Sequence, residues 1–212
     1  HAKQMQEEGK TFKPIFGVEA YFLPNLNGWK KEYEKAKADK KNKIKDDKQL
    51  GTTIEDEAAS KKEVKNILNR RRHLILLAQN QEGLNNIFKM VSDSFSKNNF
   101  YRFPRIDYKM LKTHNKGVIA ASACLGGIYA GNFWENKDKG PDAIVDAMRE
   151  TTSNMVDIFG DRWYGELQWN NIPEQHRLNK YIIQMHHEFG IPLISTADSH
   201  YPNPDAWKDR EL

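Results

Sequence analysis

The sequence is short of cysteine and of long apolar segments, and both shortages limit what the protein can be. A single cysteine, Cys124, among 212 residues excludes an intramolecular disulfide framework and suits a reducing compartment. No apolar run approaches the ~20 residues that a helix needs to cross a bilayer. The chain starts at His1, with neither an initiating Met nor a signal-peptide pattern. We therefore expect a cytoplasmic piece of a longer protein, with no membrane partner.

The composition is polar but not that of a disordered chain. Hydrophobic residues make up 38% and charged residues 29%, against usual shares of roughly 45–50% and 25%. Five Trp, eight Tyr and ten Phe are too many aromatic residues for a wholly disordered protein. The net charge of +4 is compatible with a nucleic-acid partner but too small to argue for one. The length suffices for one full-sized domain.

Short apolar runs alternate with helical patterns along most of the chain. Gly140 and Pro141 predict the start of one helix, Pro173 that of another, and Gly190 its end. A third helix, over 83–95, is expected to bury one face made of Leu84, Ile87, Phe88, Val91 and Phe95. This alternation predicts an α/β fold with a parallel sheet, either open and doubly wound or part of a closed barrel. Strands are expected in 14–24, 73–80, 117–124, 162–169 and 191–198.

Residues 25–70 interrupt this pattern with a strongly charged segment. From Lys30 to Lys65 there are 12 Lys against 9 Asp plus Glu, with only scattered apolar positions. We expect a solvated insertion with some helix, and favour it over a dedicated nucleic-acid patch. Arg70, Arg71 and Arg72 close the segment and are its best candidates for phosphate contact.

Metal-competent side chains follow or lie within four of the expected strands. Asp198 and His200 leave the last strand together, Cys124 ends another, His73 begins a third and Glu19 lies inside the first. Each has an ordinary alternative: a buried thiol for Cys124, a structural residue for His73, a wet strand face for Glu19. Because ligands bind at the carboxyl ends of parallel strands, these residues could line one common binding site.

Taken together, the donor groups of these residues indicate a metal-binding site. Carboxylate, imidazole and thiolate together suit zinc, or a cluster of metals such as manganese or iron. Clustered metals favour phosphoester hydrolysis. Glu166 alternates with Tyr164 and Gln168, which is compatible with a polar interior beside these ligands.

Several ordered segments resemble a known family. They are KPIFGVEAYFLP, HLILLAQNQEGLNNIFKMVS, YRFPRIDYKML, GVIAASACLGG, YGELQWNNIPEQHRLNKYII and IPLISTADSHYPNPDAWKDREL. Together they resemble the PHP (polymerase and histidinol phosphatase) domain, in the form found at the N-terminus of bacterial DNA polymerase III alpha subunits, the C-family polymerases. The resemblance spans nearly all of residues 1–212 except the insertion at about 25–70.

The resemblance implies a distorted (β/α)7 TIM-like barrel with up to three divalent metals at the carboxyl ends of its strands. Glu19 in VEAY matches a carboxylate that can bridge metals, and His73 and Cys124 match single ligands. Asp198 and His200 in TADSHY match the closing Asp-x-His pair. Catalysis would then involve Glu19, Asp198 and His200. The family's leading His-x-His strand has no counterpart here, so we expect a partial barrel that lacks its first βα units.

The resemblance implies a role in DNA replication, and three readings of that role stay open. The first is a metal-dependent phosphoesterase of the 3′–5′ exonuclease type, acting on DNA within a polymerase chain. The second is a non-catalytic module that stabilises the polymerase or docks proofreading or clamp subunits. The third is a free-standing PHP phosphatase, against which Cys124 and the phrase SACLGG argue.

Overall fold

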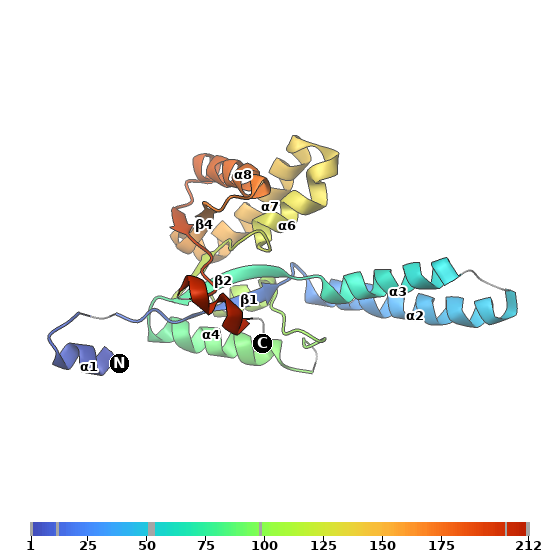
Figure 1. Ribbon diagram of the computed structural model, residues 1–212, viewed down its shortest axis with the longest axis horizontal. Coiled ribbons are helices and arrows are strands. Elements are labelled where there is room, and N and C mark those ends of the chain that lie inside the picture. The colour runs from blue at the N-terminus through green and yellow to red at the C-terminus, as the bar shows by residue number, and fades with distance from the viewer. Residues whose placement is uncertain (1, 12, 51–53, 98, 202, 211–212) are drawn as a thin grey trace. The chain divides into compact units, whose positions relative to one another are not determined.

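The computed structural model describes residues 2–11, 13–50, 54–97, 99–201 and 203–210 (Figure 1). The chain divides into two compact units, 1–119 and 120–212, and strand β3 crosses the boundary between them. Within each unit, strands that are neighbours in sequence are also neighbours in the sheet. The fold is therefore mixed α/β, as the alternation of apolar runs and helical patterns predicts.

The first unit combines two paired strands with a long helical hairpin and two shorter helices. Its helix α1 ends before Gly9, which has φ +72, a value that suits glycine at the end of a helix. The elements are α1 (Ala2–Glu7), β1 (Gly17–Phe22), α2 (Leu26–Leu50), α3 (Ile54–Asn69), β2 (Arg72–Ala78), α4 (Gln81–Ser94), α5 (Tyr108–His114) and the start of β3 (Val118–Ala121).

Strands β1 and β2 run antiparallel, which corrects the prediction of a wholly parallel sheet. The reason lies in the segment that joins them. Helices α2 and α3 form a hairpin in which the first carries the chain away from β1 and the second returns it (Figure 1). An even number of long elements brings the chain back to the end of β1 that it left, so β2 starts there and runs backwards along it.

The hairpin is more regular than the solvated insertion that the composition predicts. Its base has a small core of Leu23, Leu26, Trp29 and Ile67, against which Tyr33 packs. The indole of Trp29 donates a hydrogen bond to the main-chain oxygen of Ile67 at 2.8 Å and so joins the two helices. Lys-rich positions of α2 such as Lys31, Lys35 and Lys37 are exposed, as the predicted solvated character requires.

Helix α4 buries a face that overlaps the predicted one only in part, with Ile87 common to both. Gly83, Asn86, Ile87, Met90 and Ser94 are buried, whereas two of the aromatic residues predicted to be buried are exposed. These two residues, Phe88 and Phe95, are both 59% exposed. Close packing requires small residues at the contact: a Cβ on Gly83 would lie 1.7 Å from the main-chain oxygen of Gly117.

The second unit has the predicted parallel pattern. Strand β4 pairs parallel with β3 and with β5. Helices α7 and α8 begin at Pro141 and Pro173, and α8 ends at Gly190 with φ +68. The elements are the end of β3, α6 (Ile128–Asn136), η1 (Lys137–Lys139), α7 (Pro141–Phe159), η2 (Gly160–Arg162), β4 (Trp163–Gln168), α8 (Pro173–Phe189), β5 (Leu193–Thr196) and η3 (Pro204–Arg210).

Helices α7 and α8 of the second unit each bury a face of regularly spaced apolar residues. Ile144, Met148, Met155 and Phe159 of α7 are buried. Leu178, Ile182 and Met185 of α8 are buried as well. Among the described residues, no helix combines the length and the apolar character that crossing a membrane would demand.

Candidate metal centre

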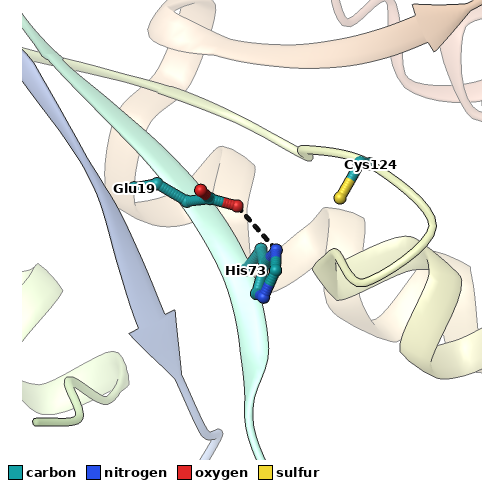
Figure 2. Close-up of side chains that lie close together, drawn as sticks. All are labelled: Glu19, His73 and Cys124. Carbon is teal, nitrogen blue, oxygen red and sulfur yellow. Dashed lines mark ion pairs between the residues drawn. The ribbon is translucent and has the colours of Figure 1, made fainter. Parts of the chain in front are cut away.

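Strands β1 and β2 bring Glu19 and His73 into direct contact. Glu19 is paired with Ile75 and Tyr21 with His73, so Glu19 and His73 are diagonal neighbours on one face of the two strands. His73 Nδ1 lies 2.6 Å from Glu19 Oε1, and Figure 2 shows the carboxyl group and the imidazole turned toward each other. Their side chains are 48% and 30% exposed, respectively. This face of β1 is therefore exposed to solvent, and a cation from solvent can reach both groups.

Aromatic and cationic side chains support this face. The Tyr21 ring lies 5.5 Å from the His73 ring. The Arg71 guanidinium lies 4.8 Å from the Tyr21 ring and 4.1 Å from the Phe103 ring. Cation–π contacts of this kind fix the position of the ring beside His73.

The arginines predicted to contact phosphate already make contacts inside the first unit. Arg70 forms a bidentate pair with Glu32, at 2.7 and 2.8 Å, and this hydrogen bonding lowers the pKa of the Glu32 carboxyl. Arg71 rests on the two rings described above and donates to the main-chain oxygen of Asn69. Arg72 is a β2 residue paired with Phe22. Phosphate contact by these three residues stays a prediction.

Cys124 belongs to the second unit and lies in a tight loop after β3 (labelled in Figure 2). The main-chain N–H of Gly126 donates to Cys124 Sγ at 3.4 Å, and that of Gly127 donates to the Cys124 main-chain oxygen at 2.8 Å. A Cβ on Gly127 would lie 2.1 Å from the main-chain oxygen of Ser122, so only glycine fits there. Ala123 has φ +60, a strained value for a residue with a side chain. The loop therefore holds the thiol in a defined, half-buried position.

Asp198 and His200 follow β5 and are exposed. Asp198 has φ +51, and His200 Nδ1 lies 2.7 Å from the main-chain oxygen of Asp198. Because β5 runs parallel to β4, both residues leave from the carboxyl end of a strand, as predicted. Within the part of the second unit that the structure describes, these two residues and Cys124 do not form a group of three neighbouring metal donors.

Two polar residues beside the predicted ligands escaped the sequence analysis. Ser122 and Thr196 are each two residues before a predicted ligand, and both bond to Glu166 of β4. The available signal was a hydroxyl residue inside an otherwise apolar run, next to each ligand. Glu166 itself is buried, with 6% exposure, so the polar interior suggested by its alternation with Gln168 is present.

The donor atoms of the predicted ligands fit a borderline divalent metal. Glu19 offers a carboxylate oxygen, His73 an imidazole nitrogen and Cys124 a thiol sulfur. Zinc accepts all three donor types, and manganese or iron accept the oxygen and nitrogen donors readily. In addition, the N–H bond to Cys124 Sγ suits a thiolate, the form in which cysteine binds a metal.

Comparison with known proteins gives a consistent result. A sequence profile described as "PHP domain" matches residues 1–170. DNA polymerase III subunit alpha of Aquifex aeolicus (strain VF5) is 35% identical over 205 residues, covering 96% of this chain and 14% of the relative. The protein of the same name from Helicobacter pylori (strain ATCC 700392 / 26695) is 35% identical over 160 residues, covering 74% of this chain and 13% of the relative. The chain thus spans about a seventh of the length of these relatives.

Proposed function

The chain belongs to the PHP domain family, and from that premise we propose that it serves DNA replication as the PHP domain of a DNA polymerase III alpha subunit, where it binds divalent metal and hydrolyses phosphoesters. The similarity over 96% of the chain to a protein of that name supports this role. In the complete domain, the strands described here would form part of a distorted (β/α)7 barrel. DNA and other subunits of a replicase would be its partners.

The contact between Glu19 and His73 is the observation on which the metal site rests. A carboxylate and an imidazole 2.6 Å apart, on neighbouring strands and partly exposed, form a preformed corner for a cation. Both side chains can turn their donor atoms to an ion from positions that their strands already fix. Zinc, manganese or iron would suit the site, and such an ion supplies Lewis acidity and an activated water when bound.

Cys124 is the proposed third ligand. It lies five residues after Ile119, the last residue of the first unit. The resemblance to PHP domains assigns it as a single metal ligand, and its Sγ accepts the main-chain N–H of Gly126, which suits a thiolate. The strained backbone at Ala123, next to Cys124, is typical of a functional site.

Asp198 and His200 are the proposed closing pair. Their exposed positions after β5 leave them accessible to metal and to a phosphoester. In binding metal, His200 would exchange its contact with the Asp198 main-chain oxygen for an ion. Glu19, Asp198 and His200 would then hold the ion and orient the scissile phosphate, giving a reaction of the 3′–5′ exonuclease type.

The proposal is tested with Co²⁺ as a spectroscopic probe in the parent polymerase that contains this chain. A thiolate bound to Co²⁺ gives an intense charge-transfer band, so wild type should show the band and Cys124→Ser should lose it. Degradation of a single-stranded DNA oligonucleotide from its 3′ end should fall at least ~100-fold in Asp198→Asn. Asp161→Asn, an exposed carboxyl in η2, is the matched control and should change neither readout.

The outcomes separate the three readings. Metal binding with no hydrolysis of any phosphoester would contradict the catalytic proposal and support a structural or docking module. Hydrolysis of a small phosphomonoester such as p-nitrophenyl phosphate, without DNA degradation, would support a phosphatase. No cobalt band in wild type would overturn the Cys124 ligand.

A further inference from the structure

A buried carboxyl group lies at the centre of the second unit's sheet. Glu166 is 6% exposed and occupies the middle strand, β4. Its Oε1 accepts a hydrogen bond from the Thr196 hydroxyl at 2.5 Å and one from Gln168 Nε2 at 3.2 Å. A buried carboxyl group is costly unless such partners are present, so the arrangement is specific rather than incidental.

Glu166 connects the ends of the two strands that flank β4. Its main-chain N–H donates to Ser122 Oγ at 2.9 Å, at the end of β3. Its side chain accepts from Thr196, the last residue of β5. Ser122 is 1% exposed, so this arm of the connection is shielded from water. One residue of β4 therefore fixes both flanking strand ends.

The polar network extends from Glu166 into helix α8. Gln168 is 2% exposed, and its main-chain oxygen accepts from Asn179 Nδ2 at 2.8 Å. Asn179 Oδ1 in turn accepts from Gln175 Nε2 at 2.9 Å. A buried hydrogen-bond network of this kind restrains the side chains and strand ends that it joins. The strand ends are thereby tied to a helix that packs on β4.

Strained backbone lies directly beyond each anchored strand end. Ala123, next to Ser122, has φ +60, and Asp198, two residues after Thr196, has φ +51. Non-glycine residues keep such conformations only where the surrounding structure over-determines them. The two strained positions are also the places where Cys124 and Asp198 must be aimed. Ser122 and Thr196 are the fixed points from which each strained segment starts.

We propose that Glu166 is a positioning residue for the metal centre, holding the Cys124 loop through Ser122 and the Asp198 segment through Thr196. This inference rests on the proposed metal-binding function and names a further residue of that same site. Glu166 touches neither the metal nor the phosphoester in this role. Partners of this type behind metal ligands are typically worth 10–100-fold in metal affinity.

The experiment measures Co²⁺ affinity and the thiolate charge-transfer band in the parent polymerase. Glu166→Ala removes the acceptor for Thr196, and we expect the Co²⁺ dissociation constant to rise ~10–100-fold. Glu166→Gln keeps an acceptor oxygen and should restore most of the affinity. Ser122→Ala should weaken the charge-transfer band, because it frees the loop that carries Cys124. Thr196→Val should reproduce Glu166→Ala, and the double variant should add little to either.

A matched control separates positioning from general stability. Thr152→Val removes a buried hydrogen bond to Tyr129, 2.7 Å long, between α7 and α6 of the same unit. It should lower thermal stability about as much as Glu166→Ala while leaving Co²⁺ affinity unchanged.

Three results would overturn the inference. A Glu166→Ala variant with wild-type Co²⁺ affinity would overturn the positioning role of Glu166 but not the metal site. An equal loss of affinity in Thr152→Val would reduce the Glu166 effect to general destabilisation. Absence of the cobalt band in wild type would overturn the metal site, and the positioning role with it.

Discussion

The two units bury their largest side chains by different means. In the first unit Arg105 has no exposed surface. Its guanidinium donates to the main-chain oxygens of Arg70, Tyr101, Phe103 and Leu68, and lies 4.3 Å from the Trp29 ring. In the second unit the completely buried large side chains include Trp163, Tyr129, Met148 and Met155. Both interiors contain apolar side chains, such as Phe22 and Leu74 in the first unit, but only the first adds a fully buried cation among main-chain oxygens within the described residues.

The difference follows from what each interior must join. Arg105 connects the end of α3 with the segment before α5, because it donates to main-chain oxygens in both. A guanidinium with five N–H donors satisfies several such carbonyls at once. Burial lowers its pKa to about 10, which still leaves a cation at neutral pH. In the second unit, neutral side chains such as Ser122 and Asn179 bond the main-chain groups of Glu166 and Gln168, and no guanidinium takes this role among the hydrogen bonds of the described residues.

Replacing Arg105 should produce the largest effect and break the first interior. Arg105→Met removes the donors for four main-chain oxygens and the cation stacked on Trp29, and we expect a loss of about 3–5 kcal/mol in the free energy of unfolding. Urea unfolding of the full chain measures the loss, and hydrogen exchange should place it in residues of the first unit. Arg102→Met, an exposed arginine over the same Phe103 ring, should change stability by less than ~0.5 kcal/mol. Equal effects of the two variants would contradict the role of Arg105.

Replacing Met148 with a smaller residue should destabilise the second unit by leaving a cavity in its interior. Met148→Ala should cost about 2–5 kcal/mol, because a fully buried side chain leaves a void among helices. Met148→Leu should cost less than ~1.5 kcal/mol, since it restores most of the volume. Glu150→Ala, an exposed position on the same helix, is the control.

A conservative exchange at each site sharpens the contrast. Leucine should rescue Met148, whereas Arg105→Lys should not rescue Arg105, because an ammonium cannot reach the carbonyls that a planar guanidinium spans. Rescue by lysine would show that charge alone holds the first interior. Failure of leucine at 148 would show that the second interior depends on more than volume.

The smallest expected effect concerns an exposed ion pair of the second unit. Arg149 bonds Glu188 at 2.7 and 2.9 Å, joining α7 to α8, and these hydrogen bonds lower the pKa of Glu188 to about 2. Because the folded pKa lies below the usual value, the pair stabilises the fold above pH ~4.5 and loses this contribution as the pH falls toward 2.

Melting temperatures of wild type and Arg149→Gln, measured from pH 6 to pH 2, test this pair. The difference between the two proteins should be small and should shrink toward acid pH. Lys180→Gln, at an exposed position of α8, is the control and should show no such trend. A difference that grows toward acid pH would contradict the assignment.

The same contrast explains where reading the sequence succeeded. In the second unit, the period of the apolar residues and the positions of Pro141, Pro173 and Gly190 were enough to place α7 and α8. In the first unit, the pattern predicted α4 and the burial of Ile87, but it wrongly placed Phe88 and Phe95 on the buried face. Periodicity counts apolar residues, whereas the close approach of α4 to the main chain of Gly117 required a small residue, Gly83.

The site shows the same division. Glu19, His73 and Cys124 could be named from residue type and from the resemblance to PHP domains. The contact between Glu19 and His73 could not, because it depends on the register of β1 with β2 across the hairpin. Glu166 was visible as an alternation, but its two hydroxyl partners were not.

The sequence by itself determined the family, the α/β class and the residues able to bind a metal, because these depend on residue types and local spacing. Only the tertiary structure decided the direction of β2, the buried cation at position 105 and the anchoring of two strand ends on Glu166. Those features arise between segments distant in the chain, where hydrogen-bond geometry and close packing select one arrangement among many that the local pattern allows.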